Sequence, residues 1–115
     1  MNSIYNTRKR ALEGCKREAN FAFSFAEKAK QRAAEGNCSA AWSCADNAKV
    51  AATCAMQAHD ALWELTKGKL TADEFEAFEA AEQAQGRALA AARAAAGSVA
   101  KAQAEYDKAH GIKRK

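Results

Sequence analysis

The apolar positions of the chain recur at alternating intervals of three and four residues, the spacing of an α-helical seam. Three stretches follow it, and we predict helices over residues 4–34, 39–66 and 72–96. The seam positions are mostly alanine: Tyr5, Leu12, Cys15, Ala19, Ala22, Ala26, Ala29, Ala33; Ala41, Cys44, Ala48, Ala51, Ala55, Ala58, Leu62, Leu65; Ala77, Ala81, Ala84, Ala88, Ala91, Ala95. Such seams fit helices crossing at about +20°. The pattern therefore predicts an all-α fold, an up-down-up antiparallel three-helix bundle with an alanine-rich seam, forming one domain over residues 1–115.

Short polar segments mark the ends of these helices. Residues 35–37, Glu-Gly-Asn, carry a helix C-cap signal, and Ser39 is a candidate N-cap for the second helix. Residues 67–70 form the next turn. Thr71 and Glu74 then have the spacing of a capping box, in which each side chain accepts from the other residue's backbone N–H. We therefore expect the third helix to open at this box.

Large apolar residues cluster at one end of the predicted bundle. Full burial of a leucine or phenylalanine contributes about 1.5–3 kcal/mol, and one alanine methyl much less. The up-down-up arrangement brings together Tyr5, Leu12, Leu62, Trp63, Leu65, Leu70, Phe75 and Phe78. We expect this end to be the main core.

The third helix is longer than its predicted partners. Paired back along the second helix, it reaches the far end of the bundle near Gly97 and Ser98. Residues 99–110 then either continue it as a projection, break at that point into a short fourth helix, or pack on another subunit. Residues 111–115 form a basic tail.

The composition agrees with an all-helical protein. Proline is absent and more than a quarter of the residues are alanine, the strongest helix former. The N-terminus has no apolar segment of the signal-peptide kind, and no run of about 20 apolar residues could span a membrane. We therefore expect a cytoplasmic protein whose four cysteines are reduced.

Charge is distributed unevenly along the sequence. Residues 60–85 contain seven acidic and two basic residues, whereas residues 1–32 contain eight basic and three acidic ones. The bundle topology places the basic residues Arg8, Lys9 and Arg10 near the acidic residues Asp60, Glu64, Asp73 and Glu74, so part of this charge is expected to be neutralised within the fold. The basic candidates for contact with nucleic acid or an acidic partner are Lys101, Lys108, Lys113, Arg114 and Lys115.

The sequence offers little for catalysis or metal binding. The cysteines are not paired at zinc-site spacing, no HExxH occurs, and glycines do not form a phosphate loop. Cys54 and His59 are five residues apart, so they do not share a helix face. We predict no enzyme activity, no cofactor and no metal site. A thiol- or metal-dependent bundle is kept as a second alternative.

Two sets of aromatic residues are candidates for a binding surface. Trp42, Lys49, Met56 and Trp63 recur at intervals of seven, and tryptophan and methionine mixed with charged residues are typical of interfaces. Packing against the flank of the third helix is the competing explanation. On the first helix, Phe21 points away from the seam and Phe25 continues its face, although Phe25 also flanks the seam and is a core candidate. The predicted partner-binding residues are Trp42, Met56, Trp63, Phe21 and Phe25.

These features favour a non-enzymatic protein-binding module whose partner is another protein. Small helical proteins without catalytic motifs are common among phage- and plasmid-encoded inhibitors of host machinery, anti-CRISPR proteins included. The working hypothesis is such an inhibitor, acting by occlusion on a host protein or nucleoprotein complex. A nucleic-acid-associated protein that uses its basic terminal segments is the alternative. A second copy of the chain, giving a homodimer, is a further candidate partner, and no membrane partner is expected.

Overall fold

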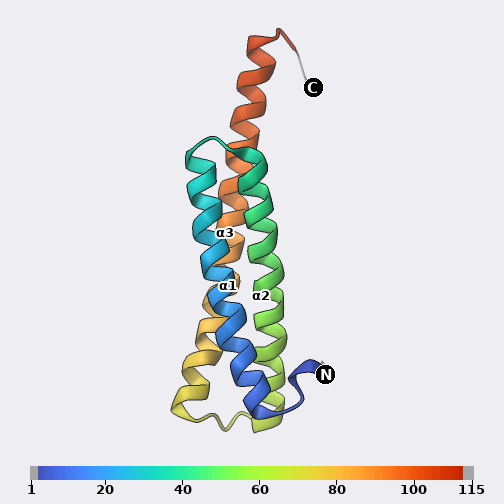
Figure 1. Cartoon of the computed structure of the whole chain (residues 1–115), viewed down its shortest axis with the longest axis vertical. Helices are drawn as coiled ribbons and strands as arrows, with labels where there is room; N and C mark the ends of the chain where they lie inside the picture. The colour runs from blue at the N-terminus through green and yellow to red at the C-terminus, as the bar shows by residue number, and fades with distance from the viewer. Residues whose placement is uncertain (1–2, 113–115) are drawn as a thin grey trace.

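Three long helices form the molecule, as the alternating apolar spacing predicts. The computed structural model describes residues 3–112. After a short 3₁₀ segment η1 (Ser3–Tyr5), the chain forms α1 (Arg8–Ala34), α2 (Cys38–Thr66) and α3 (Ala72–Ala109). The helices run up, down and up, and each packs on the other two (Figure 1). The predicted all-α three-helix bundle is confirmed.

The helix ends follow the capping residues, which corrects two predicted starts. The first helix begins at Arg8 instead of residue 4, because extended Thr7 accepts from the Arg10 backbone N–H and caps it. The second helix begins at Cys38 instead of residue 39. Its N-cap is Asn37, whose side chain accepts a hydrogen bond from the Ala40 backbone N–H, whereas the prediction placed the N-cap at Ser39. The helix C-cap signal in residues 35–37 is confirmed, with Gly36 at φ 78°.

The seam is buried along the whole bundle. Most predicted seam alanines are fully buried, and further buried alanines beside the seam widen it: Ala11, Ala45, Ala52 and Ala61. Leu62 and Cys15 are the largest side chains that are completely buried. The lower end in Figure 1 holds the larger core residues: Tyr5 and Leu62 are buried in one cluster, and Leu12, Leu65 and Leu70 are partly buried against that cluster.

Trp63 and Phe75 were predicted in this core, and that prediction is wrong. Both side chains are about half exposed. Trp63 follows the buried Leu62 by one residue, a rotation of about 100° around the helix, and Phe75 precedes the buried Ala77 by two. Both therefore lie outside the seam, and Trp63 lies at the side of α2 that borders α3.

The third helix does not break at Gly97. It continues to Ala109, so the projecting alternative is observed and the short fourth helix is not. Ser98 marks the end of the three-helix section, because its hydroxyl donates to the Ala33 carbonyl (3.2 Å). Residues 99–109 extend alone beyond the turn that joins α1 to α2 (Figure 1), for about 16 Å at helical rise.

One helical glycine, Gly14, is closely surrounded and another, Gly97, is not. We expect alanine at these two positions to change the free energy of unfolding in opposite directions. A Cβ at Gly14 would lie 2.9 Å from Cδ1 of Tyr5 and 3.0 Å from the Cβ of Ala58, whereas at Gly97 it would meet nothing within 4 Å. Gly97→Ala should raise the free energy of unfolding by about 0.8 kcal/mol through helix propensity. Gly14→Ala should lower it by about 1 kcal/mol, because overpacking outweighs that gain.

Urea denaturation of the two variants measures both changes. Equal stabilisation by the two substitutions would contradict the close packing of Tyr5 on Gly14.

Candidate functional site

The predicted stripe on α2 borders a groove between α2 and α3. Lys49 and Trp63 both line hollows that α3 closes from the other side. Met56 is partly buried between them in the same stripe, and Trp42 is exposed near the start of α2. Helical rise spreads the stripe from Trp42 to Trp63 over about 30 Å. Two hollows between α2 and α3 lie within this span, and together we call them the groove; Trp42 and Met56 line neither hollow.

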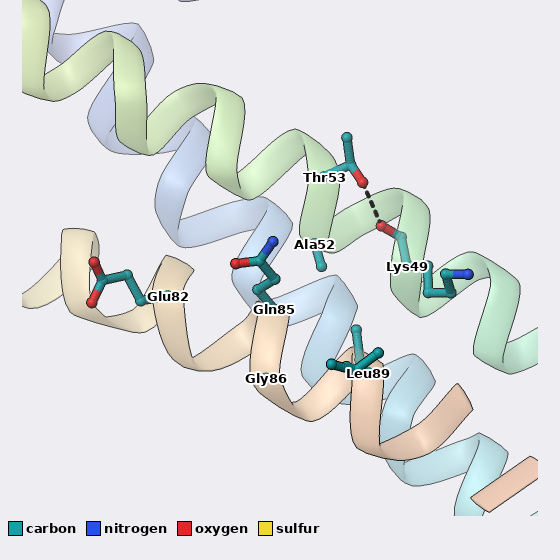
Figure 2. Close-up of a pocket in the computed structure, with 8 residues that line it drawn as sticks. Lys49, Ala52, Thr53, Glu82, Gln85, Gly86 and Leu89 are labelled. Atoms are coloured by element: carbon teal, nitrogen blue, oxygen red, sulfur yellow. Dashed lines mark hydrogen bonds between the residues drawn. The ribbon is translucent and has the colours of Figure 1, made fainter. Parts of the chain in front are cut away.

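The middle of the groove is a shallow hollow of about 390 Å³. Its floor is made of small residues, Ala52 from α2 and Ala88 from α3. Figure 2 shows the stretch of α3 that carries Gln85, Gly86 and Leu89 lying across from the stretch of α2 that carries Lys49, Ala52 and Thr53, with Glu82 farther along α3. Leu89 is 49% exposed although it is a large apolar residue. We call this stretch the central hollow.

Gly86 lines the central hollow and adds no side chain to it. A Cβ there would meet nothing within 4 Å, so packing within the chain does not require glycine. A glycine inside a helix costs about 1 kcal/mol relative to alanine. Glycine within a regular element also permits another backbone to approach closely.

A second hollow of about 500 Å³ lies at the Trp63 end of the groove. We call it the acidic aromatic hollow. Its lining residues are His59, Asp60, Trp63, Glu64 and Phe78.

The rings of the acidic aromatic hollow are held in place by their neighbours. The imidazole of His59 stacks on the Phe78 ring, with centroids 3.5 Å apart and planes 22° apart. The Trp63 ring is tilted by 35° to Phe78 at 5.8 Å. It also lies against Gly68, which at φ 78° forms the turn below it. The Trp63 indole is therefore positioned by packing and still half exposed.

His59 joins the two hollows by bridging carboxylates. Its Nδ1 lies 3.0 Å from Oδ1 of Asp60, and its Nε2 lies 3.2 Å from Oε1 of Glu82, which also lines the central hollow. The imidazole is nearly buried, whereas both carboxylates are largely exposed. A neutral imidazole has one N–H and can donate to one of these groups, and an imidazolium can donate to both.

The phenylalanines predicted for binding lie elsewhere. Phe23 contacts Arg87 of α3, with the guanidinium carbon 4.6 Å from the ring centre. Phe21 and Phe25 lie on the other side of α1 by helical periodicity, away from α3. Phe21 is exposed, and Phe25 is partly buried against the alanine core with Lys28 near its ring. The structure does not bring them together with Trp63.

The projecting end of α3 carries two of the five basic candidates. Lys101 and Lys108 are exposed there, but Glu105 and Asp107 lie on the same segment. The apolar seam continues onto it through Val99, Ala102 and Tyr106. Lys113, Arg114 and Lys115 lie outside the described residues.

The cysteines are free thiols of differing exposure. Burial raises the pKa of the Cys15 thiol to about 11. Burial and the nearby charge of Glu18 also raise the pKa of Cys54. A raised pKa lowers the thiolate fraction, so neither thiol has the character of an activated nucleophile. Among residues 3–112, no group of three or more potential ligand side chains is arranged to hold a metal ion.

The comparisons assign no function to this site. No family model, curated protein or solved structure matches the chain. Of the helices in the described part of the chain, none combines the length and apolar character needed to cross a bilayer. Of the five predicted partner-binding residues, Trp63 alone lines either hollow, and Phe78, Glu82 and Leu89 were not predicted as binding residues. Periodicity on α3 places these three on one flank of the seam, which was the available signal.

Proposed function

We propose that the chain is a non-enzymatic protein-binding module that takes a helical segment of a partner protein into the groove between α2 and α3. The observation that carries this proposal is the central hollow, where exposed Leu89 stands beside a floor of alanine and Gly86. A fourth helix laid there would bury Leu89. It would also approach α3 closely at Gly86, as small residues at a helix contact allow.

The groove suits a helix more than a small substrate. Both hollows are open and shallow, and they follow one another along the helix axes. An amphipathic helix docks into such a groove through side chains on one of its faces. Binding of this kind inhibits a partner by covering a surface that the partner needs, the mode of action suggested by the sequence.

Matched substitutions test this proposal. Leu89→Glu places a charge in the groove, whereas Val50→Glu makes the same kind of change at a residue that is 64% exposed on another face of α2. Both variants should fold, because neither side chain belongs to the core. Affinity capture with quantitative mass spectrometry should recover a stoichiometric partner with wild type and Val50→Glu. Leu89→Glu should lose it, with affinity reduced at least tenfold.

Two outcomes would count against the groove. If Leu89→Glu keeps the partner and Phe21→Glu loses it, the binding surface is the exposed side of α1. If binding requires nucleic acid, falls steeply with salt and ignores Leu89→Glu, the chain is a nucleic-acid-associated protein.

A further inference from the structure

Within residues 3–112, no lysine or arginine forms an ion pair with the carboxylates of the acidic aromatic hollow. Among the described residues, Arg8 pairs with Glu74 and Lys16 pairs with Asp73. The charges of these two acidic groups at this end of the bundle are therefore neutralised by ion pairs. In the same part of the chain, Asp60 and Glu82 have ion contacts with His59 alone, and Glu64 forms no ion pair. The hollow therefore combines an exposed aromatic ring with uncompensated negative charge.

The aromatic geometry selects a flat cation. His59 covers one face of Phe78, so the half-exposed Trp63 indole is the ring surface that a ligand can reach. A cation over a tryptophan face gains about 0.5–2 kcal/mol, and a guanidinium group stacks there while its N–H groups reach carboxylates at the sides. The carboxylates flanking Trp63 are Asp60 and Glu64, on the same helix.

We infer that the acidic aromatic hollow binds the guanidinium group of an arginine side chain. The source of that arginine rests on the proposed function: it is one residue of the helical segment that lies along the groove. Leu89 of the central hollow and Phe78 of the acidic aromatic hollow are eleven residues apart on α3, about 16 Å at helical rise. The partner helix therefore carries its arginine about eleven residues from the apolar side chain that packs on Leu89. Arginine is among the residues most enriched at the centres of protein interfaces.

The hollow can be tested without knowing the partner. The probes are N-acetyl-arginine amide and N-acetyl-citrulline amide, its uncharged isostere, titrated into ¹⁵N-labelled protein. The indole N–H resonances report binding, with Trp63 inside the hollow and Trp42, at the other end of α2, as an internal control. Arginine amide should shift Trp63 in a saturable manner and leave Trp42 unchanged. Citrulline amide should bind at least tenfold more weakly.

Charge variants locate the site. The double variant Asp60→Asn, Glu64→Gln should weaken arginine binding at least tenfold, and Glu64→Gln alone, which leaves the His59 contacts intact, should weaken it measurably. Glu105→Gln on the projecting end of α3 removes one negative charge far from the hollow and should change nothing. Thermal unfolding confirms that each variant is folded.

The failures of the two proposals are distinguishable. No saturable Trp63 shift with arginine amide, or an equal shift with citrulline amide, overturns the guanidinium site. A partner that is lost with Leu89→Glu would still support the groove in that case. If arginine amide binds at Trp63 while partner capture ignores Leu89→Glu, the guanidinium site stands and the proposed groove function fails.

Discussion

Replacing Leu62 by alanine is expected to lower the free energy of unfolding by about 3 kcal/mol. Leu62 is fully buried and is the largest side chain with that property, in a core made almost entirely of alanine. An alanine core has few side-chain atoms that could move into the cavity that Leu62→Ala leaves. Total stabilities of small domains are about 5–15 kcal/mol, so this one change removes a large part.

Leu89→Ala is the matched control, because Leu89 is 49% exposed and lies in the groove. It should change stability by less than about 0.5 kcal/mol, and by the proposed function it should still weaken partner binding. Urea denaturation followed by far-UV circular dichroism measures the stability of Leu62→Ala and of Leu89→Ala. A Leu62→Ala protein as stable as wild type would show that the alanine seam supplies the stability without the larger end of the core.

The seam was predictable because it depends on local periodicity. Positions such as Ala48, Ala55 and Leu62 are separated by seven residues, and helical geometry alone places them on one face. The capping box at Thr71 was predictable for the same reason, since its contacts span three residues. The prediction placed Trp63 and Phe75 in the core because they are large and lie at that end of the bundle. Their angular positions around the helix axes put them outside the seam.

Contacts between elements could not be derived in this way. The fit of Tyr5 on Gly14 depends on η1 turning back across α1, and the stack of His59 on Phe78 depends on the register of α2 against α3. The sequence also did not determine whether α3 continues beyond Gly97, as it does in the structure. A single glycine among alanines costs about 1 kcal/mol, which is too little to show whether the helix breaks or continues. The sequence therefore indicated Trp63 as a groove residue, but it did not indicate the α3 residues that lie opposite α2.

The Arg8–Glu74 pair is expected to make the bundle sensitive to acid. Glu74 is buried, and its Oε1 and Oε2 accept from Nη2 (2.6 Å) and Nε (3.0 Å) of Arg8. It also accepts from the Thr71 backbone N–H (2.9 Å), which completes the capping box predicted from the sequence. These hydrogen bonds, that to the Arg8 side chain first, lower the pKa of Glu74 from 4.5 to about 2.

A carboxyl whose pKa is lower in the folded protein binds its proton more readily when unfolded, so stability falls as pH falls. The contribution of Glu74 is complete above about pH 5 and is lost as the pH decreases from the unfolded pKa of 4.5 through about 2. Glu74→Ala should cost about 2.5 kcal/mol at neutral pH, through two charged hydrogen bonds and a helix cap. Glu74→Gln should cost about half as much, because glutamine can still close the capping box.

Glu76→Gln is the control, because it removes the same charge from an exposed position in the first turns of α3. It should change stability by less than about 0.5 kcal/mol at any pH. Denaturation at pH 7, 4 and 2.5 should show the difference between wild type and Glu74→Gln shrinking with acid. A difference independent of pH would mean that Glu74 acts through its shape alone. Because the pair ties the start of α1 to the start of α3, its loss should loosen the end of the bundle that also holds the acidic aromatic hollow.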